Sequence, residues 1–467
     1  MKQKSGFSGQ IGFVLAAAGS AVGVGNLWRF PYLAAKDGGG LFLIIYLVLV
    51  LTVGFTLLTT DIAIGRKTGK SAIYAYESMR KKWKFLGVIT FIVPVIIMTY
   101  YAVIGGWILK YIAIYILGSG KEAVADNCFT NFITSPSSVW YGIIFMLLTA
   151  IIVYNGVEKG IERVSKFIMP VLLVMVVGIA IFSLTLKTTL DDGTVRTGLQ
   201  GLKVYLTPDM SGITVQKFLQ VSLDAMSQLF FSLSVSMGIM ITYGSYVKKD
   251  VNLNKAVSQI EIMDTGVAFL AGMMIIPAVF VFSGLDGMSA GPGLMFVSLP
   301  NVFFRMGMAG RIVFLLAGFA ALTSCISVLE SITANCMELF HTERKKTTGV
   351  LSIIYLIATA VIALGYSIFY VEVKLPNGST GQLLDIMDYI SNSFLMPFIS
   401  LLSAILIGWI IKPSWIVEEM ELNGKKFSRK KLYNVMIRYI MPVIMVILFL
   451  QSTGFLDVLI SKIQKFI

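Results

Sequence analysis

Two small-residue stretches, AAAGSAVGVGN at residues 16–26 and FSLSVSMG at residues 231–238, interrupt otherwise apolar segments of this chain. Lipid offers no hydrogen-bonding partner, so a membrane helix can break only where its freed N–H and C=O groups meet something polar. Two such breaks in corresponding positions of two halves are typical of an ion and substrate site near the bilayer midplane. We therefore expect both stretches to contribute to one binding site.

The rest of the chain has the composition of a membrane protein. It contains 467 residues, of which 56% are hydrophobic and 13% charged, with a mean hydropathy of +0.82. About eleven apolar runs are long enough to cross a bilayer, near residues 11–37, 40–64, 86–117, 138–154, 164–186, 217–246, 254–284, 309–340, 348–370, 382–411 and 433–460. The predicted fold class is an all-α integral membrane protein, with residues 1–467 forming a single transmembrane domain.

The net charge of +13 raises the alternative of nucleic-acid binding, but the distribution of the charges argues against it. Most of the 38 Lys and Arg residues fall in alternate loops, including clusters at residues 66–84, 248–255, 344–346 and 412–431. This bias is typical of loops on the cytoplasmic side of a membrane. We expect a multi-pass protein of the cell membrane with a cytoplasmic N-terminus and, after eleven spans, an extracellular C-terminus.

Three functional classes compete for such a chain: a symporter, a membrane receptor and an intramembrane enzyme. An enzyme needs a nucleophile with a base, or a metal triad, but the chain has one histidine, His341, and three dispersed cysteines. The cysteines, Cys128, Cys325 and Cys336, lie at different levels of the expected topology, so no disulfide is predicted. A receptor would need a signalling module, for which no segment is left. These considerations favour a transporter, and we expect no enzymatic activity.

Further motifs follow the first break in a characteristic order. The chain reads GSAVGVGNLWRFP at residues 19–31, and then shows DGGG (37–40), DIAIGR (61–66), YYAVIGGW (100–107), GVEKGIER (156–163), QLFFSLS (228–234), ITYGSY (241–246), GPGL (291–294), LTS (322–324) and LDIMD (384–388). This series resembles the neurotransmitter:sodium symporters, and its eleven-span length is similar to that of bacterial amino-acid members. The resemblance implies two inverted repeats, at residues 10–186 and 213–411, an eleventh helix at 430–460, and alternating access around broken helices 1 and 6.

The same resemblance implies two sodium sites. The first would use Ala21, Asn26, Ser232 and Asp264, and the second would use Gly19, Val22, Ala320, Thr323 and Ser324. Exposed carbonyls and hydroxyls suit a hard cation, which prefers several oxygen ligands. On residue type alone, the adjacent hydroxyls of Thr323 and Ser324 could instead bond back to the preceding helical turn.

The implied substrate site predicts a neutral amino acid. It would comprise Ser20, Ala21, Gly23, Gly25, Ile97, Tyr101, Phe231, Ser232, Ser234, Met237, Ser324 and Val328. Monoamine-transporting members resemble one another in having Asp where this chain has Gly23, so the substrate must bring its own carboxylate, for which Tyr101 is the expected donor. No charged residue lines the side-chain part, which favours hydrophobic L-amino acids. A compliant Met237 suits aromatic rings, whereas the resemblance argues against large side chains, because members that take them have Gly where this chain has Ser236. Aliphatic and aromatic substrates both remain open.

Gate residues and a flexible turn complete the expectations. The resemblance implies an outer gate of Arg29 and Asp388, and an inner gate that includes Lys4, Glu338 and Tyr246. Gly160 and Pro170, near the start of the fifth helix, weaken helical structure, so this turn is expected to unwind and release the second sodium ion.

Asp264 departs from better-known members, which have Asn at this position. A carboxylate in an apolar helix is costly and indicates function. Some bacterial members carry a Glu one helical turn later, where this chain has Ala268. Asp264 can supply the missing negative charge, so we predict transport without chloride; whether a proton is counter-transported stays open.

Overall fold

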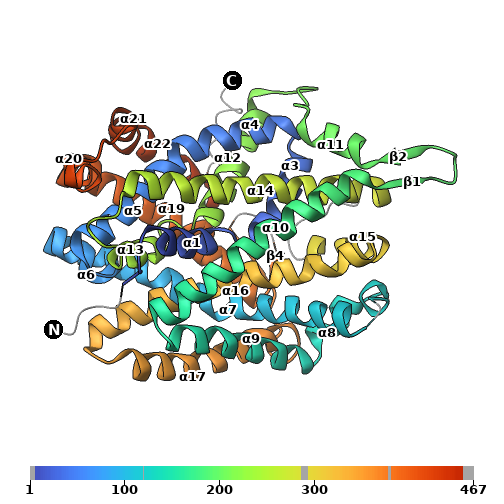
Figure 1. Ribbon diagram of the computed structural model, residues 1–467, viewed down its shortest axis with the longest axis horizontal. Coiled ribbons are helices and arrows are strands. Elements are labelled where there is room, and N and C mark those ends of the chain that lie inside the picture. Colours follow the sequence, from blue (N-terminus) through green and yellow to red (C-terminus); the bar gives the residue numbers. More distant parts are fainter. Residues whose placement is uncertain (1–5, 119, 285–292, 377–379, 456–467) are drawn as a thin grey trace.

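The computed structural model describes residues 6–118, 120–284, 293–376 and 380–455, and it is almost entirely helical (Figure 1). Within these residues, nine helices are long and apolar enough to cross a membrane: Gly40–Thr68, Lys81–Leu117, Ser137–Tyr154, Val157–Thr185, Leu253–Ser283, Met308–Phe340, Arg344–Tyr366, Leu383–Ile411 and Lys430–Ser452. The predicted all-α membrane fold is confirmed.

Some of these spans are single α-helices, and others join α-helices to short π-helical or 3₁₀ segments. Their α-helical parts are α4 (Gly40–Leu49), α5 (Phe55–Thr68), α7 (Lys84–Leu117), α9 (Ser137–Tyr154), α10 (Arg163–Thr185), α14 (Leu253–Ser283), α16 (Met308–Phe340), α17 (Arg344–Ala363), α18 (Leu383–Asp388), α19 (Met396–Ile405), α21 (Lys430–Val435) and α22 (Met441–Ser452). The π-helical segments include η4 (Val157–Glu162), η8 (Tyr389–Leu395) and η9 (Leu406–Ile411). Such segments often occur where a helix serves a function.

The first predicted break is present. Two residues separate α1 (Gln10–Ala21) from α2 (Val24–Leu27), which continues through Trp28 into α3 (Arg29–Lys36). The two halves of this span are bent by 61°. Val22 has extended backbone (φ −69°, ψ 92°), so the helical ladder stops there.

The second predicted break separates α12 (Val215–Leu233) from α13 (Ile239–Ser245). Three residues between them have positive φ: Ser234 at 52°, Ser236 at 61° and Gly238 at 76°. α12 is too polar and α13, with 7 residues, is too short to count as a span, so the structure gives nine spans, or ten with the bent first helix, among the described residues. The expected count of eleven stays a prediction.

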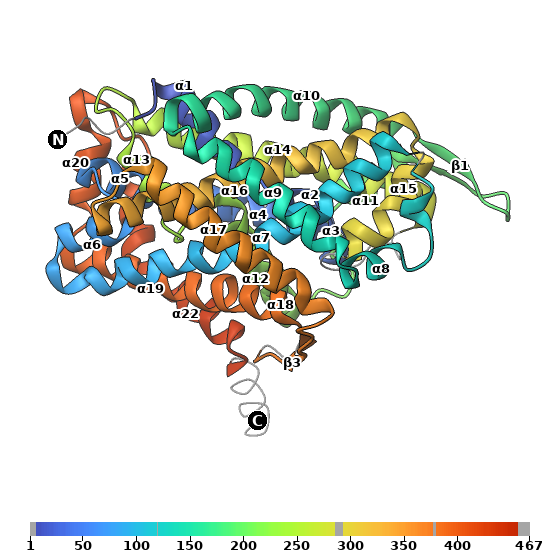
Figure 2. The same ribbon diagram turned by 90° about the horizontal axis from the view of Figure 1, so that it is seen from below.

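Smaller elements lie outside the spans. They are α6 (Ala72–Met79), α8 (Cys128–Thr134), α11 (Gly198–Leu206), α15 (Leu299–Arg305), α20 (Ser414–Met420), and two hairpins, β1 (Lys187–Thr189) with β2 (Val195–Thr197) and β3 (Val373–Lys374) with β4 (Thr380–Gly381). Figures 1 and 2 both show the β1–β2 hairpin projecting from the end opposite α6 and α20.

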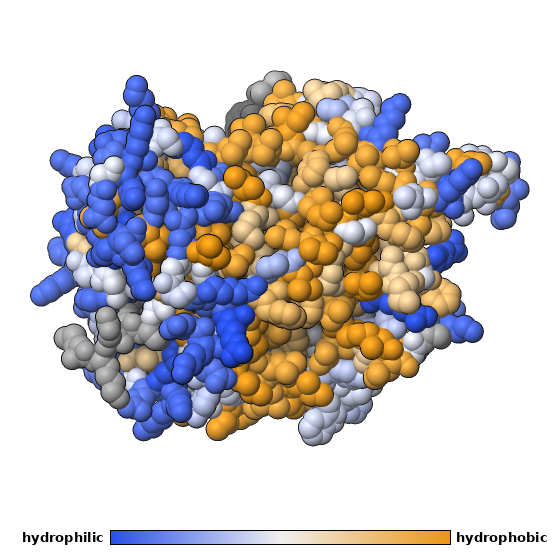
Figure 3. Space-filling model, viewed as in Figure 1, coloured by the Kyte–Doolittle hydropathy of each residue, from blue (hydrophilic) through white to orange (hydrophobic). Residues whose placement is uncertain are grey.

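The surface divides into an apolar band and a hydrophilic end. In Figure 3 hydrophobic residues cover the middle of the molecule, while hydrophilic residues cover the left end, where Figure 1 places α20 and α6. Lys70, Lys81 and Lys425 belong to this end and are exposed; we call it the basic end. Because a bilayer covers only the apolar band, the helices cross it roughly along the long axis of the molecule.

α1 lies inside the bundle, where it packs against α10, α14 and α16. α12 packs against α4, and α13 packs against α5. The two breaks are therefore buried among the long spans, although the N-terminal part of α12 is exposed, and the freed backbone groups face protein. This arrangement meets the requirement that irregular backbone at membrane depth be shielded from lipid.

Candidate functional site

The two breaks meet at the backbone carbonyl of Ser20. The Ser234 hydroxyl, in the second break, donates to this carbonyl at 3.0 Å. The Ser324 hydroxyl, on α16, donates to the same carbonyl at 3.1 Å. Three segments that are far apart in the sequence therefore converge on one oxygen atom, at the point that the sequence predicts for the binding site.

The side chains expected at the first sodium site form a compact cluster. Asn26 Nδ2 donates to Asp264 Oδ1 at 2.9 Å, and Ser232 Oγ lies 2.8 and 2.9 Å from the two Asp264 carboxylate oxygens. Ser232 also donates to Asn26 Oδ1 at 3.3 Å. All three side chains are buried. A carboxylate, an amide oxygen and a hydroxyl within reach of one another suit a hard cation such as sodium.

The residues expected at the second sodium site also lie together, between α1 and α16. The Thr323 hydroxyl bonds back to the carbonyls of Phe319 (3.0 Å) and Ala320 (3.1 Å), so the alternative of back-bonding holds for Thr323 here. The Ser324 hydroxyl instead reaches Ser20 across the break. A Cβ atom at Gly19 would come within 3.3 Å of Thr323, which shows how closely the two helices approach.

A small cavity of about 30 Å³ lies next to these clusters. It is lined by Ser20, Ala21, Gly23, Asn26, Ile97, Tyr100, Tyr101, Phe231, Ser234, Met237, Ile239, Ser324, Val328 and Asn392. Ten of the twelve residues expected for the substrate are among them, while Gly25 and Ser232 are not.

Close approaches explain two glycines beside this cavity. A Cβ atom at Gly23 would lie 3.1 Å from Ser324 Oγ and 3.3 Å from the Tyr101 hydroxyl. A Cβ atom at Gly25 would overlap the Phe231 ring. The Tyr101 hydroxyl thus faces the bare backbone of the first break, where a substrate carboxylate could accept its hydrogen bond.

Phe231 also lines a larger cavity of about 510 Å³. Phe231, Tyr100, Tyr101 and Asn392 line both cavities, so the larger one is a vestibule for the smaller. Arg29 and Asp388, the predicted outer gate, both line the vestibule. The Arg29 guanidinium lies over the Phe231 ring, 5.8 Å from its centroid.

At the basic end, side chains at the end of α13 and on α16 are in direct contact. The Tyr246 hydroxyl donates to Glu330 Oε1 at 2.6 Å, and Arg344 Nη2 donates to the same oxygen at 2.7 Å. Phe7 is buried and packs edge-on against Tyr243 and Tyr246. Aromatic rings and a buried ion pair therefore fill the region between α13 and α16.

Of the predicted inner gate, Tyr246 and Glu338 can be described. Lys4 lies outside the described residues. The Glu338 carboxylate accepts hydrogen bonds from the backbone N–H of Ser71 at 3.1 Å and from its hydroxyl at 2.5 Å. Glu330 and Arg344, which sequence reasoning missed, form the contact with Tyr246; a carboxylate in the apolar α16 segment was the available signal.

The turn predicted to unwind is helical here, but not α-helical. Gly160 lies in the π-helical segment η4, which leads into α10 with Pro170 inside it. A Cβ atom at Gly160 would overlap the Ile152 carbonyl of α9, so only glycine allows this approach. The Ser8 backbone N–H donates to Glu162 Oε2 at 2.8 Å, which ties the N-terminal segment to this turn.

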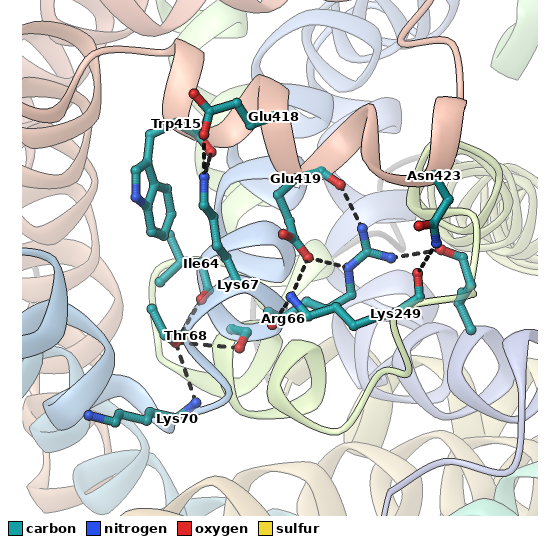
Figure 4. A network of polar contacts seen from close by, with 12 residues as sticks. Ile64, Arg66, Lys67, Thr68, Lys70, Lys249, Trp415, Glu418, Glu419 and Asn423 are labelled. Atoms are coloured by element: carbon teal, nitrogen blue, oxygen red, sulfur yellow. Dashed lines mark hydrogen bonds and ion pairs between the residues drawn. The ribbon is translucent and has the colours of Figure 1, made fainter.

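A network of polar contacts at the basic end joins α20 to α5 (Figure 4). Arg66 donates to Glu419 Oε1 and to the Glu419 carbonyl, both at 2.6 Å, and to the Val251 carbonyl at 2.7 Å. The side chains of Arg66 and Glu419 are 2% and 4% exposed. Lys249 donates to Glu419 Oε1 at 2.9 Å, so one buried carboxylate holds two cations.

This architecture, with two broken helices that meet at a cluster of oxygen ligands between a vestibule and a closed end, defines a membrane transporter. The model of the sodium:neurotransmitter symporter family matches residues 4–119 and 126–462, and the chain belongs to that family. The structure is similar to the crystal structure of MhsT in complex with L-phenylalanine, with a TM-score of 0.83 and 35% identity, covering 96% of this chain and 100% of that one.

The curated relatives include sodium-dependent transporters from bacteria and from a mammal. An uncharacterized sodium-dependent transporter of Bacillus subtilis (strain 168), YhdH, is 34% identical over 97% of this chain and 98% of its own length. One from Haemophilus influenzae is 32% identical over 97% and 98%, respectively. The sodium- and chloride-dependent GABA transporter 2 of Rattus norvegicus is 25% identical over 90% and 75%.

Proposed function

We propose that this protein imports hydrophobic L-amino acids by symport with two sodium ions, by alternating access and without chloride. The observation that carries the proposal is the buried cluster of Asn26, Ser232 and Asp264 beside the cavity that Tyr101 lines. A substrate carboxylate at this place would contact both the Tyr101 hydroxyl and the first sodium ion. Binding of the ion and of the substrate would then be linked.

The lining of the cavity supports a hydrophobic side chain. Ile97, Phe231, Met237 and Val328 form its apolar part, and no Lys, Arg, Asp or Glu among the described residues lines it. Buried charged substrate groups would lack a partner there, at a cost of several kcal/mol. MhsT has been crystallised with L-phenylalanine, which supports an amino acid as the substrate of this relative.

Chloride independence follows from the charge of Asp264. Two sodium ions and a zwitterionic amino acid carry an excess of two positive charges, which is costly at membrane depth. The Asp264 carboxylate lies inside the first cluster and offsets part of this charge. The position one turn later is Ala268, which is buried and uncharged, so Asp264 is the acid that takes this role.

The orientation rests on the distribution of charge. The hydrophilic end in Figure 3 is the basic end, where α6 and α20 lie with the neighbouring Lys70, Lys81 and Lys425, and it would face the cytoplasm, as Lys- and Arg-rich loops do in membrane proteins. The N-terminus would then be cytoplasmic and the vestibule would open outward. With Tyr246 bonded to Glu330 at the opposite end, this corresponds to an outward-facing state of a protein in the cell membrane.

The test is uptake into proteoliposomes with an inward sodium gradient, competed by each of the twenty common amino acids. We expect leucine-like or aromatic amino acids to compete and charged ones to have no effect. Replacing chloride by gluconate should leave wild-type uptake unchanged, while Asp264→Asn should lose most of its uptake in gluconate. Loss of wild-type uptake in gluconate, or full Asp264→Asn activity there, would contradict the role given to Asp264.

A further inference from the structure

The second break contains two serines in a backbone conformation that L residues rarely adopt. Ser234 and Ser236 have φ values of 52° and 61°, in the left-handed region. Such a conformation persists only where surrounding contacts hold it. For Ser234 that contact is the hydrogen bond to the Ser20 carbonyl.

Ser236 is held from two sides. Its backbone N–H donates to Asp61 Oδ2, on α5, at 2.8 Å. Its hydroxyl is hydrogen bonded to the hydroxyl of Ser400, on α19, at 2.6 Å. The Ser400 hydroxyl also lies 2.9 Å from the Met396 carbonyl one turn earlier, which fixes its own orientation. All of these polar side chains are buried.

Ser236 itself does not line the substrate cavity, but Ser234 and Met237 do. The direction of the Met237 side chain depends on the backbone angles of the preceding residue, because a change at Ser236 rotates all that follows. We infer that Ser400 is a positioning residue for the substrate side chain, acting through Ser236 on Met237. This inference rests on the proposed function, since Met237 is assigned there to the side-chain part of the cavity.

The same helix provides a matched control. Ser403 is also buried in α19, three residues after Ser400, and the Tyr76 hydroxyl donates to it at 3.2 Å. Tyr76 belongs to α6, and this hydrogen bond does not touch the second break. Ser403→Ala therefore removes the same group from the same helix without releasing Ser236.

The first test needs no substrate. Hydrogen–deuterium exchange is measured on the full-length protein in detergent, for peptides that cover residues 231–240. Losing one hydrogen bond should raise the exchange rate of this segment about fivefold in Ser400→Ala, whereas Ser403→Ala should match the wild type. Unchanged exchange in Ser400→Ala would overturn the inference, whether or not any amino acid binds.

The second test is a double-mutant cycle with L-phenylalanine and L-leucine as probes, in saturating sodium. Ser400→Ala should weaken binding about fivefold and change the ratio of the two affinities. Glycine adopts left-handed backbone without strain, so Ser400→Ala should have no further effect in a Ser236→Gly background. Equal losses in both backgrounds would overturn the inference. If the wild type binds neither probe, the proposed function is contradicted. The hydrogen–deuterium exchange result then decides by itself whether Ser400 holds the second break.

Discussion

Arg29 and Asp388 line one vestibule, yet each is bonded to a different partner. Arg29 Nη2 donates to Ser227 Oγ at 2.7 Å, while Asp388 Oδ1 accepts hydrogen bonds from Tyr100 at 2.9 Å and Asn392 at 2.6 Å. At the other end of the pathway, Tyr246 and Glu330 are in direct contact. Arg29 and Asp388 therefore bond to other groups at the vestibule, whereas Tyr246 and Glu330 are paired at the basic end; we predict that closure over a substrate brings the guanidinium to the carboxylate.

We predict that Asp388→Asn impairs transport more than binding. An amide oxygen can keep the contacts seen here, but a neutral amide cannot form an ion pair with Arg29 in the closed state. Uptake should fall about tenfold, which corresponds to roughly 1.4 kcal/mol, with little change in equilibrium binding. Asp385→Asn, in the same vestibule, is the control; wild-type uptake by Asp388→Asn would show that no such pair forms.

Asn26→Ala and Ser232→Ala should each weaken the binding of sodium and of substrate together. Both side chains contact the Asp264 carboxylate, and each substitution removes an oxygen ligand from the expected first sodium site. Since linkage is reciprocal, the loss of substrate affinity should be about tenfold at low sodium and smaller at saturating sodium. Isothermal titration at two sodium concentrations measures both affinities. An unchanged substrate affinity at low sodium would show that the first sodium site and the substrate site are not linked.

Pro170→Ala should slow release at the basic end. Proline weakens the helical ladder of α10, and alanine restores it, so the turn that contains Gly160 unwinds less readily and the second sodium ion is held longer. The uptake rate should decrease while binding from the vestibule side is unaffected. Pro277→Ala, a proline inside α14, is the control. If Pro170→Ala transports at the wild-type rate, the segment is an ordinary helix start.

Arg66→Gln should destabilise the protein strongly. It leaves the buried Glu419 carboxylate with Lys249 as its remaining cation (Figure 4), and removing one partner of a buried pair costs about 3–5 kcal/mol. Lys67→Gln removes the pair with Glu418, which is 69% exposed, and should cost less than about 1 kcal/mol. Thermal unfolding in detergent compares the two; equal melting temperatures would contradict the role of the network.

The positions of the breaks could be predicted from the sequence because glycine, serine and asparagine clustered within an apolar run weaken a helix and add polar groups that lipid cannot satisfy. The long spans followed from hydropathy in the same way. The helix at 433–460 was predicted to continue further than α22, which ends at Ser452; residues 456–467 lie outside the described part of the chain. The β1–β2 hairpin and α20 have no hydropathy signal and were not predicted.

The contacts that hold the site in place were harder to predict from the sequence. Asp61 belongs to the motif DIAIGR, but the sequence does not indicate its partner. Its hydrogen bond from the Ser236 backbone N–H depends on how α5 crosses the second break. Ser400 is one of two serines in an otherwise apolar helix, and Arg344 lies among loop charges, so neither stands out in the sequence. Their partners, Ser236 and Glu330, are 164 and 14 residues away, and only the packing of helices brings each pair together.

The central claim is sodium-coupled amino-acid transport, and the most direct test is uptake of radiolabelled L-phenylalanine and L-leucine by the wild-type protein in proteoliposomes. Two sodium ions entering at 100 mV supply roughly 4.6 kcal/mol from the potential alone, at about 2.3 kcal/mol per charge. We predict accumulation against a gradient with external sodium, increased by an inside-negative potential, and none with choline and a proton gradient. Equal accumulation with choline and protons, or no accumulation with sodium, would contradict the account.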